Sequence, residues 1–262
     1  MTIFRHEMRR GRTALLVWTA GIAAMILICI MIFPEMKEQM ESFSRLFASL
    51  GAFTAAFGMD RISFGDLMGF YGIECGNILG IGGALYAALL GILALSGEER
   101  NHTAEFLLTH PVSRTHIVLW KLLAAAAQII LLNAASALAA VLSAALIGEV
   151  FAWKEFLLMH LAYLLMQLEI ASVCFGISAF LHRGGTGIGL GLATVFYFLG
   201  LLANLSDKAD FLKYITPFGY ADSADIISAG GLDLALIAIG LTVSAAAVAT
   251  AFYKYHKKDI AA

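Results

Sequence analysis

Six apolar segments constrain the fold of this chain more than any other feature of the sequence. A helix of about 20 apolar residues is long enough to cross the hydrocarbon core of a bilayer. In lipid the backbone polar groups must bond within their own segment, so each segment is predicted to be an α-helix. The six predicted spans cover residues 14–33, 73–95, 122–147, 156–180, 186–203 and 234–253. The predicted fold class is therefore an all-α polytopic membrane protein.

The composition excludes a soluble fold and limits the number of domains. The chain of 262 residues is 60% hydrophobic and only 14% charged, whereas a soluble domain carries about 25% charged residues. Six spans use about 120 positions, which leaves room for loops but not for a second domain of ordinary size. We therefore expect a single transmembrane domain over residues 1–262. The net charge of −2 gives no electrostatic basis for binding nucleic acid.

The cysteines and histidines indicate neither a disulfide framework nor a metal site. The three cysteines lie inside or at the edge of apolar segments, and no Cys/His ligand spacing appears. The spacing of His102, His110 and His116 matches no compact metal-ligand motif, so we interpret these residues as solvated histidines.

The basic N-terminal segment has two interpretations. Residues 1–13 contain four arginines, and Arg5, Arg9 and Arg12 share one helical stripe, which is typical of a short helix lying in the membrane interface. Alternatively, the segment is only the basic flank of the first span, whose end we expect at Pro34. A cleaved signal peptide is disfavoured, because the first apolar run is too long and no small-residue cleavage site follows it.

Lys and Arg are distributed unequally among the connections, which predicts the orientation of the chain. With the N-terminus inside, the inner segments hold eleven of the 17 Lys and Arg residues, although the outer segments are longer. Cytoplasmic loops of membrane proteins are enriched in these two residues. Both termini, and the connection between the second and third spans, are therefore predicted to be cytoplasmic.

Two further patterns predict helix packing. Gly72, Gly76 and Gly80 recur at every fourth position, and such a stripe of small residues lets another helix approach closely, within the subunit or across a dimer. The connection after the first span has apolar residues at three- to four-residue spacing over 36–47, which predicts an amphipathic helix.

The connection 97–114 combines dense charge with an apolar centre, Phe106-Leu107-Leu108. A short segment of this kind between two spans is too charged to sink into lipid. Its three apolar residues need a groove on a partner protein, or else they lie in the headgroup layer as interfacial residues do.

Local signals predict that this connection forms a short helix. Ser96 and Glu99 have the spacing of a capping box, which predicts that a helix begins here. Pro111 ends such a helix, because the residue before a proline is forced out of the α conformation. Ser113 is then expected to cap the third span.

Residues 98–114 resemble the cytoplasmic loop between the second and third spans of the type-2 ABC transporter permeases. The matching residues are Glu98-Glu99, Thr103, Glu105, Leu107-Leu108 and Pro111-Val112-Ser113-Arg114. The residue before this threonine is often Gly in that family and is His102 here. The six spans, the basic N-terminus and the aromatic stretch 214–218 before the last span extend the resemblance over the whole chain.

The resemblance implies that the loop is a coupling helix that docks in a cleft of a cytoplasmic ABC ATPase. It assigns to this coupling Glu98, Glu99, Arg100, Thr103, Glu105, Phe106, Leu107, Leu108, Pro111, Ser113 and Arg114. Phe106 and Leu107 are the expected buried anchors, and Glu105 and Arg114 are the expected charged partners. The polar break at 182–185 is a candidate second contact.

The chain contains no G-x-x-x-x-G-K-[ST] phosphate loop, so it is not expected to hydrolyse ATP or to bind a cofactor itself. ATP and Mg are expected on a separate partner ATPase. One six-span subunit forms half of a pathway, which implies a second permease copy or a paralogue. The resemblance implies export across a cell membrane, in this case the bacterial plasma membrane. Antimicrobial peptides, lipids and drugs all remain candidate substrates.

Polar residues inside the predicted spans are candidates for a pathway, namely Glu169, Gln128, Asn133 and Gln167. An ionisable residue at this depth is a functional hypothesis by default. Glu169 either lines the pathway or is protonated and bonded to one of the three amides. Two other classes of function remain open, a proton-coupled secondary transporter that uses Glu169 and a membrane-embedded enzyme. Inverted repeats would favour the former, and none is evident in the sequence.

Overall fold

A computed structural model of the chain describes residues 2–39, 51–100, 113–182 and 184–257. Six helices in these ranges are long and apolar enough to cross a membrane, which confirms the predicted number of spans. They are α1 (Thr2–Glu38), α5 (Gly76–Arg100) with its N-terminal extension, α7 (Arg114–Leu146), α8 (Trp153–Ser178), α9 (Thr186–Ala203) and α11 (Leu234–Lys257). The described ranges contain no β-strand, so the all-α fold class is confirmed as well.

Shorter helices complete the fold. They are α3 (Gly51–Ala56), α4 (Leu67–Phe70), the π-helix η1 (Tyr71–Cys75), the 3-10 helices η2 (Asp207–Tyr214) and η3 (Pro217–Tyr220), and α10 (Ser223–Ala229). The elements α4 and η1 run directly into α5, so the second span begins at Leu67. The predicted amphipathic helix over 36–47 lies largely outside the described residues.

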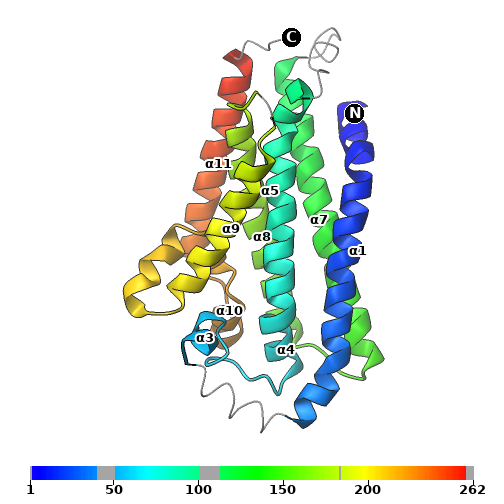
Figure 1. Ribbon diagram of the computed structural model, residues 1–262, viewed down its shortest axis with the longest axis vertical. Helices are drawn as coiled ribbons and strands as arrows, with labels where there is room; N and C mark the ends of the chain where they lie inside the picture. Colours follow the sequence, from blue (N-terminus) through cyan, green and yellow to red (C-terminus); the bar gives the residue numbers. More distant parts are fainter. Residues whose placement is uncertain (1, 40–50, 101–112, 183, 258–262) are drawn as a thin grey trace.

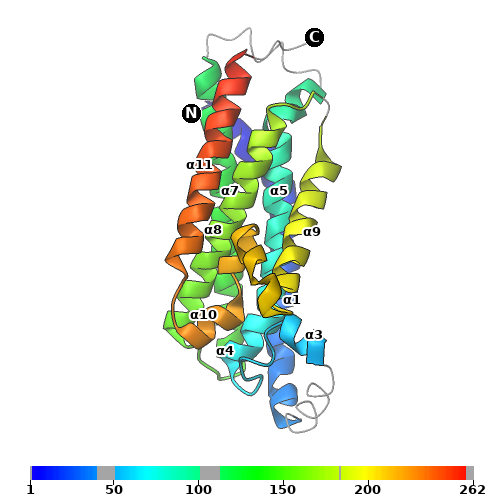
Figure 2. The ribbon, with the colours of Figure 1, turned by 90° about the vertical axis from the view of Figure 1, so that its left-hand side faces the viewer.

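The long helices stand side by side as an upright bundle (Figures 1 and 2). The pair α5 and α8 forms its centre, with α1 packed on α7, α9 on α5 and α11 on α8. In the second span and in α8, 56% of the most apolar stretch of 18 residues is buried inside the protein. In α1, α9 and α11 the buried share of the corresponding stretch is 17%, so these three outer helices face lipid. The two ends of the chain lie at the same end of the bundle, and α3, α4 and α10 lie toward the opposite end (Figure 1).

Helix α1 differs from the prediction at Pro34. We expected the first span to end there, which is wrong, because α1 continues to Glu38. A proline removes one backbone hydrogen bond, but contacts on both sides hold this helix together. Phe33 is fully buried against Phe70, with ring centroids 5.2 Å apart, and Lys37 forms a 2.7 Å ion pair with Glu149.

The basic N-terminal segment is the first part of α1 rather than a separate helix. Residues 2–13 continue without a break into the first span. The interpretation as a basic flank is therefore correct, and a separate interfacial helix is not formed.

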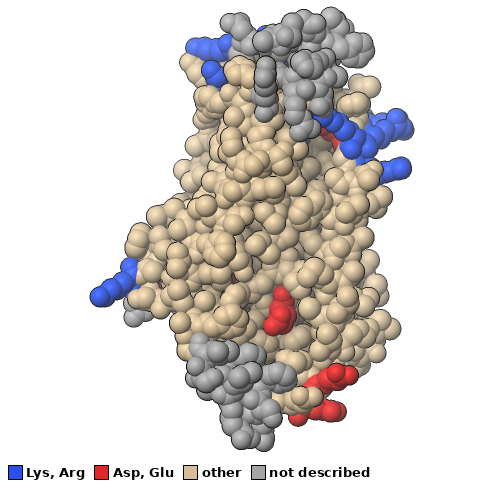
Figure 3. Space-filling view, in the orientation of Figure 1, with Lys and Arg blue, Asp and Glu red and all other residues tan. Residues whose placement is uncertain are grey.

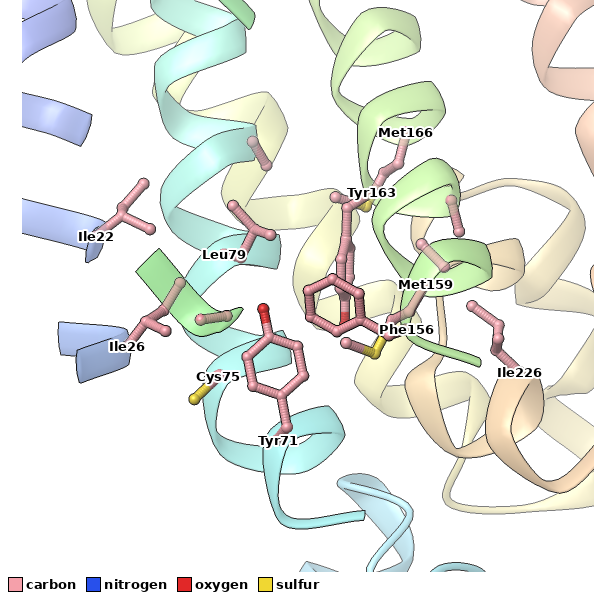
Figure 4. Packing of buried hydrophobic residues seen from close by; sticks show 14 of the residues in the cluster. Ile22, Ile26, Tyr71, Cys75, Leu79, Phe156, Met159, Tyr163, Met166 and Ile226 are labelled. Atoms are coloured by element: carbon pink, nitrogen blue, oxygen red, sulfur yellow. The ribbon is translucent and has the colours of Figure 1, made fainter. Parts of the chain in front are cut away.

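Aromatic packing surrounds the start of the second span (Figure 4). Tyr71, in the π-helix η1, is fully buried against Phe156, with ring centroids 5.6 Å apart. Its hydroxyl lies 2.9 Å from Nε2 of His160 in α8. Ile22 and Ile26 of α1 approach the same cluster from the other side (Figure 4). This cluster fixes α1, α5 and α8 relative to one another at the end opposite the chain termini.

Charged side chains are unequally distributed along the bundle. On the face shown in Figure 3, most Lys and Arg side chains lie near the end that holds the termini, and the larger acidic patches lie toward the other end. The unequal distribution of Lys and Arg is the feature from which the cytoplasmic position of the termini is predicted.

Candidate functional site

The predicted coupling segment joins α5 to α7 at the end of the bundle that holds the chain termini (Figure 1). Its centre lies outside the described residues, and so do the side chains of Glu98, Glu99 and Arg100. The predicted coupling residues in that centre are Thr103, Glu105, Phe106, Leu107, Leu108 and Pro111. The structure therefore describes the two helices that hold the segment, with Ser113 and Arg114 at its C-terminal side.

The two helix ends test the predicted caps. Ser113 is extended and its Oγ accepts a hydrogen bond from the backbone N of His116 at 3.3 Å, which confirms the predicted cap of α7. The predicted helix start at Ser96 is wrong, because α5 runs through this residue to Arg100. Ser96 is fully buried, and its Oγ donates to the carbonyl oxygen of Ile92 at 2.6 Å. Burial inside a continuous span therefore overrides the local capping signal.

Arg114 connects the start of α7 to the end of α11. Its Nη1 donates to the carbonyl oxygens of Tyr255 at 3.1 Å and His256 at 3.0 Å. A guanidinium at this position satisfies carbonyls that the helix leaves unpaired and complements the negative end of its dipole. Thr115 adds a 2.8 Å contact between its Oγ1 and Nε2 of His256. Arg114 therefore uses one of its hydrogen-bond donors, Nη1, for contacts within the subunit.

The same part of α7 is also bonded to α1. Nζ of Lys121 lies 2.8 Å from Oε1 of Glu7, and the lysine side chain is only 2% exposed. Removing one partner from a buried pair leaves an uncompensated charge, so this contact resists separation of the helices. An apolar cluster that includes Leu95, Val118 and Phe175 joins α5, α7 and α8 at this level. The segment 98–114 therefore begins and ends on helices that are held together as a unit.

The Arg114 contact predicts a local change of stability in α11. Replacing Arg114 by Gln keeps one amide donor but removes the charge and one of the two hydrogen bonds to the last turn, a loss of about 1.5 kcal/mol. We expect the amides of the last turn of α11 to exchange about tenfold faster with deuterium. Arg12→Gln, at an exposed arginine of α1, is the matched control and should leave α11 unchanged. Equal exchange in both variants would show that Arg114 does not hold this helix end.

The polar residues predicted to line a pathway lie in separate contacts. Asn133 Nδ2 donates to Oε1 of Gln167 at 2.6 Å, and Gln167 Nε2 donates to the carbonyl oxygen of Leu79 at 3.3 Å. These two hydrogen bonds join α7, α8 and α5 through residues that are all buried. Gln128 instead accepts a 3.0 Å hydrogen bond from the hydroxyl of Tyr86. The amides of Asn133 and Gln167 meet, and Gln128 does not join them.

Glu169 is bonded to a residue that the sequence did not point to. The Tyr220 hydroxyl donates to Oε2 of Glu169 at 2.7 Å, and the Glu169 side chain is buried. Of the two alternatives for Glu169, the one in which it bonds to Gln128, Asn133 or Gln167 named the wrong partner. Gly240 of α11 leaves the space that the carboxyl group occupies. A small cavity of about 50 Å³ adjoins this pair and is also lined by Lys213 and Thr216.

Variants of Glu169 separate hydrogen bonding from charge. Glu169→Gln keeps an oxygen that accepts from Tyr220, whereas Glu169→Ala leaves the buried hydroxyl without its acceptor. We expect the alanine variant to lose about 2 kcal/mol of unfolding free energy and the glutamine variant much less. The Tyr220→Phe variant should make the loss from Glu169→Ala smaller, since the two residues share one bond. Equal destabilisation by Gln and Ala in a denaturant titration would contradict this role.

The predicted glycine stripe faces elements of the same subunit. A β-carbon at position 80 would lie 3.5 Å from Cε1 of Tyr163 in α8. Gly76 lies against the hydroxyl of the same tyrosine, and Gly72 lies against Ile227 of α10. These three positions are therefore occupied by close packing within the subunit.

The polar break at 182–185 lies at the same end as the coupling segment, between α8 and α9 (Figure 2). Gly184 and Gly185 have φ angles of 61° and 156°, which side chains with a β-carbon rarely adopt. The two glycines thus allow the tight reversal that starts α9 at Thr186. Arg183 lies outside the described residues.

Six helices that can span a membrane, packed as one bundle without a β-strand in the described ranges, define a polytopic α-helical membrane protein. The chain belongs to the ABC-2 transporter family, because the family model described as "ABC-2 family transporter protein" matches residues 1–260. A search of the curated proteins finds no match. Members of this family are multi-pass membrane subunits of ABC transporters, work with ATPase subunits and are not themselves catalytic.

Proposed function

We propose that this chain is the permease subunit of an ATP-driven exporter and couples to a separate cytoplasmic ATPase through residues 98–114. The match to the ABC-2 family over residues 1–260 is the observation that carries this proposal. The unequal distribution of Lys and Arg supports a cytoplasmic position for the end of the bundle that holds this segment.

The contacts around the segment support a mechanical role. Its two ends leave from α5 and α7, and α7 is bonded to α11 through Arg114 and to α1 through Lys121. A push on the docked segment therefore acts on several helices held together rather than on one flexible loop. Rigid-body movement of packed helices is a common way to open and close a membrane pathway.

The same proposal assigns the remaining parts of the transporter. ATP and Mg bind the partner ATPase, because the sequence has no phosphate loop. A second permease copy or a paralogue completes the pathway, and the assembly works in the bacterial plasma membrane. The substrate class is an antimicrobial peptide, a lipid or a drug. Glu169 has a structural role in this scheme, since it is bonded to Tyr220 inside the subunit.

Co-purification with candidate cytoplasmic ABC ATPases tests the proposal. The permease should retain its ATPase, and a variant in which residues 101–112 are replaced by a Gly/Ser linker of equal length should lose it. Both proteins must be inserted in the membrane at equal levels. Retention of the ATPase by the linker variant would exclude this segment as the coupling element, and failure of every ATPase to bind the parent would exclude the function.

A further inference from the structure

A groove runs between α1 and α5 and has two chemically different ends. The helices lie side by side (Figure 1), and the groove has an upper part of about 290 Å³ and a lower part of about 520 Å³. Trp18 lines both parts, so they adjoin at this residue. Helix α7 also lines the upper part, which is bordered by Arg10 and by the Glu7–Lys121 ion pair. The lower part is lined almost entirely by apolar side chains.

The walls of the groove are fixed by packing. The rings of Trp18 and Tyr86 have centroids 5.9 Å apart, so Trp18 packs against α5 where the two parts of the groove adjoin. Further along, a β-carbon at Gly82 would lie 3.2 Å from Ile22, so the two helices touch there. Gly21, in contrast, is exposed and has no atom within 4 Å of its β-carbon position. The groove is therefore open toward the lipid-facing side beside Gly21.

Arg10 is the α1 arginine at the groove. Because a helix turns by about 100° per residue, Arg5, Arg9 and Arg12 project about 100° to 160° away from Arg10 around the axis of α1. Arg10 reaches across to α5, since a β-carbon at Gly97 would lie 3.6 Å from its Nη2. Among the described residues, the ion pairs include no carboxylate partner for Arg10. The groove thus combines a cationic end at Arg10 with an apolar body.

The dimensions fit a lipid chain. From Arg10 to Met25 the helix rises by roughly 22 Å, which exceeds the roughly 15 Å of hydrocarbon in one leaflet. The cationic end lies just before the predicted span, at the depth of the headgroups. We propose that this groove binds an anionic phospholipid, with its phosphate beside Arg10 and one acyl chain along Trp18, Gly21 and Met25.

A second copy of the chain fits this face less well than a lipid. In a two-fold dimer within a membrane, each residue of one subunit lies at the same depth as its equivalent in the other. Two copies of Arg10 would then meet at the same end of one interface and repel each other. A phosphate neutralises that charge, and a phosphate–arginine contact has favourable bidentate geometry.

Lipid binding by the purified protein tests the proposal. Phosphatidylglycerol and phosphatidylcholine with identical chains are added to the protein in detergent, and bound lipid is measured by intact-complex mass spectrometry. We expect phosphatidylglycerol to bind preferentially. Arg10→Gln should weaken its binding about tenfold through loss of a charge-assisted hydrogen bond. Gly21→Leu should weaken it by filling the groove.

Matched variants control for general effects of the substitutions. Arg12→Gln removes a charge from the other side of α1, and Gly191→Leu adds the same side chain at an exposed position of α9 with no atom within 4 Å. Both should bind the lipid as the parent does. Equal binding of the two lipids, or equal losses in Arg12→Gln and Arg10→Gln, would overturn the proposal.

A photoreactive phenylalanine analogue in place of Met25, an exposed residue that lines the lower part of the groove, identifies the occupant in the intact membrane. Lipid adducts of the single chain are the expected product. An adduct of two chains would show that a second copy covers the groove and would also overturn the proposal.

Discussion

The Phe106→Asp variant is expected to weaken the complex between the permease and its ATPase by about thirtyfold or more. An aromatic anchor buried in a partner pocket contributes about 2 kcal/mol or more to binding, which corresponds to this change in affinity. The expectation follows from the proposed docking of the apolar centre of segment 98–114. Titration of the purified ATPase against the permease in nanodiscs measures the dissociation constant. Glu105→Arg should weaken the same complex through charge reversal.

The matched control for Phe106→Asp is Phe211→Asp. Phe211 is an exposed phenylalanine in η2, toward the end of the bundle opposite the chain termini. The substitution is chemically identical and adds the same charge to the surface. It should leave the affinity for the ATPase unchanged. Equal affinities of the parent and Phe106→Asp, with both proteins folded, would remove Phe106 from the docking surface.

The Gly91→Val variant is expected to lose about 3 kcal/mol of unfolding free energy through overpacking. Gly91 lies where α5 meets α8, the central pair of the bundle. A β-carbon at this position would overlap the backbone carbonyl oxygen of Ala171 and would lie 2.8 Å from Cβ of Cys174. A backbone atom cannot rotate away as a side chain can, so the two helices must separate. Denaturant titration in detergent micelles measures the loss.

Gly187→Val is the control for this substitution. Gly187 lies in α9, is exposed, and has no atom within 4 Å of its β-carbon position. The same change of residue there alters helix propensity without changing the packing of two helices. It should have little effect on the unfolding free energy. A stable Gly91→Val protein would mean that α5 and α8 do not approach each other as closely as described.

The number and type of the spanning helices were predictable from the sequence because lipid imposes one rule on every segment. The fifth span, expected at 186–203, is α9 with the same bounds. Other helices extend beyond the apolar runs. Polar residues at a helix end can lie in the headgroup layer, so the helix need not stop where the apolar run stops. Thus α1 begins at Thr2 and α7 at Arg114.

The contacts of the polar residues were not predictable, because they depend on how distant segments meet. Tyr220 is 51 residues from Glu169 and belongs to a short 3-10 helix, which is too short to produce a hydrophobic periodicity in the sequence. The aromatic stretch around it was visible in the sequence, but its position over α8 was not. Ser96 shows the reverse case, in which a clear local capping pattern is overruled by burial inside a long helix.

A photo-crosslinking measurement tests most directly whether segment 98–114 docks on an ATPase. A photoreactive amino acid replaces Leu107 in one variant and Ser228 in another, and each is expressed in cells together with the ATPase. Ser228 is an exposed residue of α10, at the end of the bundle opposite the termini. A covalent permease–ATPase product is expected from position 107 and none from position 228. Capture of the ATPase from position 228, or from neither position, would contradict the coupling assignment.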